Sequence, residues 1–280
     1  MRRRFLVLDA YDDAGREALR GAGATLAGEL WRRLLVSLEP SAEVRVANLG
    51  AGAGGSPDLA GHDGIAWTGS NLTIHRETTL VRSHVEIARA ALAAGLPSFG
   101  SCWGLQIAVV AGGGTCAANP RGREFGIARG IRRTEAGSAH PVFERREDPY
   151  EAFTSHEDHA VGLGPGTTLL AGNDFSPVQA VDVRSGPGVF VAVQYHPEYG
   201  PADVAALARL RAPQLLRQGE FSDRAALDAW IDDMEGLDRD PARADLRERV
   251  GATAALLDPA TRTREVRAWL EVFVGPRRRA

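Results

Sequence analysis

Short apolar runs and longer amphipathic segments alternate through the first half of the chain. The apolar runs predict buried strands at residues 5–10, 43–49, 64–68 and 96–101. The spacing of apolar positions between them predicts helices at residues 14–38, 79–94 and 103–111. Strands that alternate with helices are typical of a parallel sheet covered by helices. The first half is therefore expected to form an α/β sheet.

The pattern changes after residue 114. Five more strands are predicted with no long helix between them, at residues 125–133, 150–155, 167–172, 178–183 and 189–195. Beyond Pro201 the chain becomes helical and charged, at residues 202–217, 223–237, 246–257 and 264–274. We expect an α/β domain with a mixed central sheet over residues 1–200, and a helical C-terminal extension over residues 201–280 that packs on it.

Composition narrows the class of protein. The 280 residues are 44% hydrophobic and 25% charged, which is enough to bury a full core. The formal net charge is −3 and the positive charges are dispersed, so we expect no nucleic-acid partner. Asp9 cuts the first apolar run too short for a signal peptide or a membrane span. We expect a cytoplasmic protein with no membrane partner.

Two residue types limit the available chemistry. The only cysteines are Cys102 and Cys116, too few for a disulfide framework or a cysteine zinc site, so a reducing compartment is expected. All 33 basic residues are Arg, which excludes a catalytic Lys, a Schiff base and a Walker-type phosphate loop. The run from His156 to His159 lacks the spacing of a catalytic zinc motif. We expect no metal and no cofactor.

The segment around Cys102 has the pattern of a nucleophile elbow. A predicted strand turns directly into a predicted helix there, with Gly100 and Gly104 two positions on either side. Such a turn strains the backbone at the nucleophile and brings other backbone too close for side chains at the glycines. A sulfur at a helix N-terminus is stabilised as a thiolate. Cys102 is the candidate nucleophile, and a buried structural cysteine is the alternative.

A thiol nucleophile needs a base, and His196 is the best placed of the seven histidines. It follows the predicted strand at residues 189–195, and Glu198 lies two residues further on. A carboxylate at that position can accept the second imidazole N–H and fix the tautomer. The predicted triad is therefore Cys102, His196 and Glu198.

A tetrahedral intermediate also requires two hydrogen-bond donors. The amide of Trp103, directly after the nucleophile, is one candidate. Gly69 follows the predicted strand at residues 64–68, and this strand can lie beside the Cys102 strand in a parallel sheet. Gly69 and Trp103 form the predicted oxyanion hole.

These motifs resemble those of the class I, or triad-type, glutamine amidotransferases, and among them the glutaminase domain of GMP synthases. Residues 100–106, Gly-Ser-Cys-Trp-Gly-Leu-Gln, match the family's Gly-x-Cys-x-Gly-x-Gln. Residues 194–198, Gln-Tyr-His-Pro-Glu, match its apolar-Gln-x-His-Pro-Glu. Weaker matches occur at residues 68–70, 122–126 and 155–158. The resemblance covers residues 5–198 and implies a flavodoxin-like fold, with the site at the carboxyl ends of the parallel strands.

The resemblance also implies roles for individual residues. Cys102 would attack the side-chain amide of L-glutamine to form a γ-glutamyl thioester, while Gln106, Ser155 and His156 would bind the substrate. No ATP-pyrophosphatase loop follows, so the ammonia would serve a separate acceptor synthase. Two alternatives stay open. One is a γ-glutamyl peptide hydrolase that uses the same thioester chemistry on glutathione-like substrates, and the other is a non-catalytic binding module.

Overall fold

The computed structural model describes residues 2–50 and 57–275, so residues 276–280 of the predicted extension lie outside the described residues. Within that part of the chain, nine strands form one sheet in the order β2-β1-β3-β4-β11-β10-β9-β6-β7. Its strands are β1 (Arg4–Asp12), β2 (Glu43–Gly50), β3 (Gly64–Trp67), β4 (Ser98–Ser101), β6 (Glu124–Arg133), β7 (Tyr150–His156), β9 (Thr167–Gly172), β10 (Ala180–Ser185) and β11 (Gly188–Val193).

The sheet combines a parallel half with an antiparallel half. Strands β2, β1, β3, β4 and β11 pair in parallel, and the pairs from β11 through β10, β9 and β6 to β7 are antiparallel. The prediction of a mixed central sheet is confirmed. Two further strands, β5 (Thr115–Ala118) and β8 (Asp158–Gly162), were not predicted; they pair with each other in a small separate sheet.

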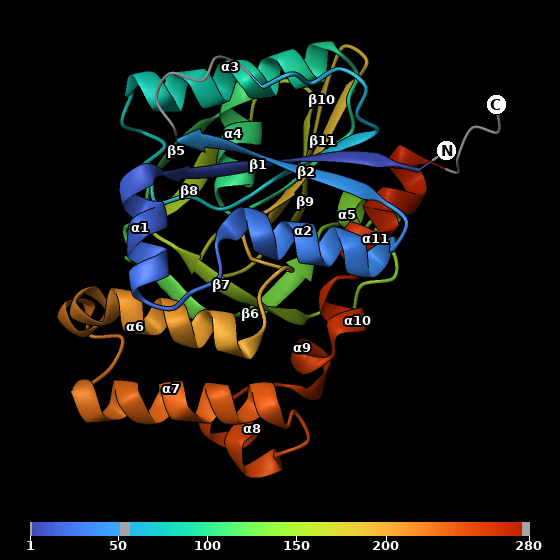
Figure 1. The fold of residues 1–280 in the computed structure, drawn as a ribbon. Helices are drawn as coiled ribbons and strands as arrows, with labels where there is room; N and C mark the ends of the chain where they lie inside the picture. Colours follow the sequence, from blue (N-terminus) through green and yellow to red (C-terminus); the bar gives the residue numbers. More distant parts are fainter. Residues whose placement is uncertain (1, 51–56, 276–280) are drawn as a thin grey trace.

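Helices cover both faces of the main sheet (Figure 1). In chain order they are α1 (Asp13–Gly21), α2 (Ala27–Leu38), α3 (Thr79–Ala93), α4 (Trp103–Ala111), α5 (Glu135–Ala139), α6 (Pro201–Gln218), α7 (Arg224–Arg239), α8 (Ala244–Val250), α9 (Ala254–Leu257), α10 (Pro259–Arg262) and α11 (Arg264–Trp269), followed by a π-helical turn (Leu270–Val274). Helices α3 and α4 bury their apolar side chains on one face, and α2 and α11 bury theirs on the other.

Two predicted helices are each broken in two, and a glycine explains both corrections. The helix predicted at residues 14–38 ends early because Gly23 has a left-handed φ of 70°, and the Ala24 amide then bonds to the Leu19 carbonyl. The helix predicted at residues 246–257 ends at Gly251, which has a φ of 68°. Glycine adopts this conformation at little steric cost, so each helix stops and the chain changes direction.

The helices after β11 pack on the sheet domain in two places. Helices α6 and α7 share an apolar cluster with Tyr11 and with Leu19 of α1. Helix α11 returns to the main sheet, where the Trp269 ring lies 5.9 Å from Phe99 of β4 and 6.3 Å from Phe5 of β1, between ring centroids. No helix within the described ranges combines the length and the apolar character needed to cross a membrane.

Candidate active site

Cys102 lies in a strained turn between β4 and α4. Its φ is 53°, and it is the one non-glycine residue with a positive φ in the described part of the chain. A Cβ at Gly100 would lie 2.8 Å from Cα of Gly104, and a Cβ at Gly104 would lie 3.2 Å from the Trp67 carbonyl oxygen. The glycines are therefore required by close backbone contacts, as the elbow pattern predicts. Cys102 is almost fully buried, at 7% exposure.

His196 and Glu198 reach the elbow because β11 pairs in parallel with β4. Ser101 lies opposite Val193 in this pairing, and the Cys102 amide donates to the Val193 carbonyl at 2.8 Å. The His196 Nδ1 and Glu198 Oε1 atoms are 2.8 Å apart, so Nδ1–H donates a hydrogen bond to the carboxylate. The other ring nitrogen, Nε2, then faces the Cys102 thiol. The three residues of the predicted triad are thus brought together.

The electrostatics of this group favour a charged imidazole. Burial by itself would lower the pKa of His196, but the Glu198 carboxylate and the neighbouring Cys102 outweigh burial and raise it to about 9. At neutral pH the imidazolium is then the main form. An imidazolium beside a cysteine stabilises the thiolate, which is the nucleophilic form.

Two further residues, which were not predicted from the sequence, contact His196 and Glu198. Ser101 donates to Glu198 Oε1 at 2.8 Å and accepts from the Trp31 indole N–H at 3.2 Å. The Tyr199 ring stacks on the His196 ring, with centroids 3.9 Å apart and planes 6° apart. Ser101 stands inside the elbow motif at a variable position, and nothing in its type or spacing indicates this contact.

The predicted oxyanion donors border the nucleophile on two sides. Because β3 pairs with β4, with Trp67 opposite Gly100, the loop after β3 lies beside the elbow. A Cβ at Gly69 would lie 2.9 Å from His196 Cε1 and 3.8 Å from Cys102 Cβ. Trp103 begins α4, so its amide is among the free N–H groups of the first turn. Their role as an oxyanion hole stays a prediction.

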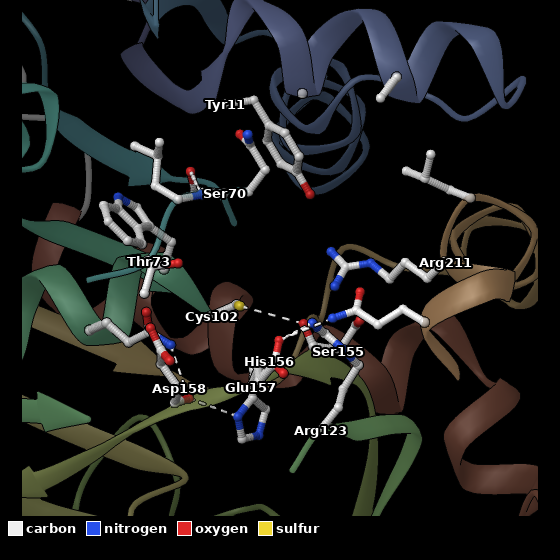
Figure 2. Close-up of a pocket in the computed structure, with 18 of the residues that line it drawn as sticks. Tyr11, Ser70, Thr73, Cys102, Arg123, Ser155, His156, Glu157, Asp158 and Arg211 are labelled. Carbon is white, nitrogen blue, oxygen red and sulfur yellow. Dashed lines mark hydrogen bonds and ion pairs between the residues drawn. The ribbon is translucent and has the colours of Figure 1, made fainter. Parts of the chain in front are cut away.

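A cavity of about 620 Å³ opens above Cys102 (Figure 2). The predicted substrate residues Gln106, Ser155 and His156 all line it. Ser155 Oγ is buried and has no hydrogen-bond partner among the described residues, so it is available to a ligand. The His156 ring is already engaged, by Glu124 at 2.8 Å and by the Asp158 carbonyl at 3.0 Å. The roles of the three in substrate binding stay predictions.

Parts of the chain are similar in sequence to known proteins. The family described as "Glutamine amidotransferase class-I" matches residues 73–206. A γ-glutamyl-L-1-hydroxyisopropylamide hydrolase from a Pseudomonas species is 36% identical over 166 residues, which cover 58% of this chain and 56% of the relative. A glutamine-hydrolysing GMP synthase from Bordetella avium is 29% identical over 142 residues, 49% of this chain and 25% of the relative. The chain therefore spans about half, or less, of these relatives.

A solved structure extends the likeness to the whole fold. A glutamine amidotransferase from Thermotoga maritima has a TM-score of 0.63 and 16% sequence identity, with 98% of this chain and 99% of that chain covered. Its coverage includes the helices after β11. Residues 73–206 match the class I glutamine amidotransferase family, which agrees with the resemblance of the motifs.

Replacing Ser101 with Ala is expected to lower the free energy of unfolding by about 2 kcal/mol. The substitution leaves the buried Trp31 N–H without an acceptor and removes a donor from Glu198. Ser98 on the same strand is a matched control, because it is also buried and the one hydrogen bond of its hydroxyl to a described residue, the Leu96 carbonyl, is long at 3.4 Å. Urea unfolding of Ser101→Ala and Ser98→Ala measures the difference. Equal losses would show that the Ser101 contacts add nothing.

Proposed function

We propose that the protein hydrolyses γ-glutamyl amides through Cys102. The Cys102 thiolate attacks the γ-carbonyl carbon, and the oxyanion that forms lies near the amides of Gly69 and Trp103. His196 Nε2 gives its proton to the amine nitrogen as the C–N bond breaks, which leaves a γ-glutamyl thioester. His196 then takes a proton from water, the hydroxide attacks the thioester, and the thiolate and glutamate are released. Glu198 holds the His196 ring in position throughout.

The observation that carries this proposal is the cavity above a cysteine paired with His196. Its volume of about 620 Å³ is in the range of cavities that hold drug-sized ligands, so an amine part has room beyond the γ-glutamyl group. The γ-glutamyl amide hydrolase relative supports the same substrate class. The substrate in the name of that relative has an amine part larger than ammonia.

Hydrolysis of L-glutamine, with the ammonia passed to an acceptor synthase, is the second candidate. The GMP synthase relatives favour it, since those proteins are named as glutamine-hydrolysing. The two candidates share the thioester chemistry and differ only in the leaving amine.

A substrate series tests the proposal and separates the candidates. Purified protein is incubated with L-glutamine, γ-glutamylethylamide and glutathione, and released glutamate is measured in each case. We expect glutamate from at least one of the two substrates with a larger amine part, at a higher kcat/KM than from glutamine. Turnover of glutamine alone would support the second candidate. Release of glutamate from none of the three would refute both.

A further inference from the structure

Helix α6 forms one wall of the catalytic cavity, although it lies beyond the motifs that define the family. Its residues Leu210, Arg211 and Gln214 line the cavity together with Cys102. Figure 2 shows the Arg211 side chain extending from α6 toward Tyr11 and Cys102. The guanidinium of Arg211 is thus placed where it can contact a substrate bound at the nucleophile.

The Arg211 guanidinium has no carboxylate partner within residues 2–50 and 57–275, where no ion pair to it occurs. Its neighbours are the phenol of Tyr11 and the guanidinium of Arg123. Burial raises the pKa of the Tyr11 phenol, while Arg211 acts in the opposite direction. Burial and then the Arg211 charge lower the pKa of Arg123 to about 10. The two guanidinium groups are therefore close enough to repel each other.

Of these two cations, only Arg123 forms an ion pair with a described residue. Arg123 Nη2 pairs with Glu157 Oε2 at 2.5 Å, and Glu157 also accepts from Gln214 and Gln218 of α6. Arg123 Nε is buried without a hydrogen-bond partner among the described residues. A partly buried guanidinium next to a second one is unfavourable unless an anion joins them. Arg211 and Arg123, which both line the cavity, provide positive charge and N–H donors for a carboxylate.

We infer that Arg211 binds a carboxylate of the substrate and so selects anionic γ-glutamyl compounds. This inference rests on the proposed function, from which it takes γ-glutamyl compounds as the substrate class. A γ-glutamyl compound offers a carboxylate from two sources, the α-carboxylate of the glutamyl part or an acidic group on the amine part. Guanidinium and carboxylate form two parallel hydrogen bonds in either case.

The test compares Arg211→Gln with wild-type protein on L-glutamine, γ-glutamylethylamide and γ-glutamylglycine. Loss of a charge-assisted contact is expected to lower kcat/KM by about 10- to 100-fold, mainly through KM. A loss on all three substrates identifies the α-carboxylate as the bound group. A loss confined to γ-glutamylglycine identifies the carboxylate of the amine part.

Arg209→Gln is the matched control, because Arg209 is on the same helix but pairs with Glu235 of α7, 2.5 Å away. Equal kinetics for Arg211→Gln and Arg209→Gln on every substrate would overturn the inference. Binding is measured separately, by calorimetric titration of γ-glutamylglycine into Cys102→Ala protein with and without Arg211→Gln.

The binding measurement separates this inference from the proposed function. If wild-type protein hydrolyses neither these three substrates nor glutathione, the proposed function fails, and an affinity at least about 10-fold weaker with Arg211→Gln still supports the carboxylate site. Equal affinities, or no binding to either protein, would overturn the carboxylate site.

Discussion

Replacing Cys102 with Ala is expected to lower kcat/KM for γ-glutamyl amides by about 10⁴-fold or more. The substitution removes the sulfur that forms the thioester, and the other cysteine of the chain does not line the cavity. The second cysteine, Cys116, is partly buried in β5, and burial raises the pKa of its thiol to about 12. Initial rates of glutamate release, measured with wild-type and Cys102→Ala protein, give the ratio directly.

Cys116→Ala is the control for that experiment and should keep full activity. Iodoacetamide provides a second measurement that needs no substrate, because it reacts with thiolates. Mass spectrometry is expected to find the label on Cys102 and none on Cys116 at pH 7. Activity that survives in Cys102→Ala, or disappears in Cys116→Ala, would contradict the proposed nucleophile.

Replacing Glu198 with Gln is expected to lower kcat/KM at pH 8 by about 10²- to 10⁴-fold and to move its pH dependence. His196 must carry a proton to give to the leaving amine, and its pKa is about 9, with Glu198 the strongest of the groups that raise it. Wild-type activity should therefore fall as the pH rises through about 9. In Glu198→Gln this alkaline limb should move to lower pH, by at least about one unit.

The raised pKa of His196 also makes the free energy of unfolding depend on pH. The folded value of His196 is above the 6.5 of an unfolded chain, so the ion pair contributes fully to stability below about pH 6.5. That contribution is lost as the pH rises through about 9. Glu235→Gln serves as the control, because Glu235 forms only a partly exposed ion pair on α7. An alkaline limb that stays in place in Glu198→Gln would contradict this account of His196.

The parts of the fold that the sequence predicts well are those set by local patterns. The apolar runs of β1, β3 and β4 and the glycines around Cys102 each depend on neighbours a few residues away. The breaks at Gly23 and Gly251 were missed because an isolated glycine inside a helical pattern is often tolerated, and only the φ value shows that the helix ends.

In the candidate site too, the residues placed by local patterns could be predicted, and those placed by long-range packing could not. Cys102, His196 and Glu198 follow strand ends, so their meeting at one edge of the sheet could be inferred from sequence order and pairing rules. The roles proposed for Ser101 and Arg211 depend on contacts with residues far away in the sequence. Which face of α6 is turned to the cavity depends on its packing against α1 and α7, and periodicity alone does not fix it.

The contact between Trp269 and Phe99 also bears on how the protein folds during synthesis. Phe99 lies three residues before Cys102, on the strand that leads into the elbow, and Trp269 covers it from α11. A contact between residues so distant in the chain forms late, since most of the polypeptide must emerge first. In the nascent chain, Phe99 therefore stays without this contact until Trp269 has been made and packs on it. In a chain stalled on the ribosome before α11 is made, Phe99 of β4 would lack its contact with Trp269.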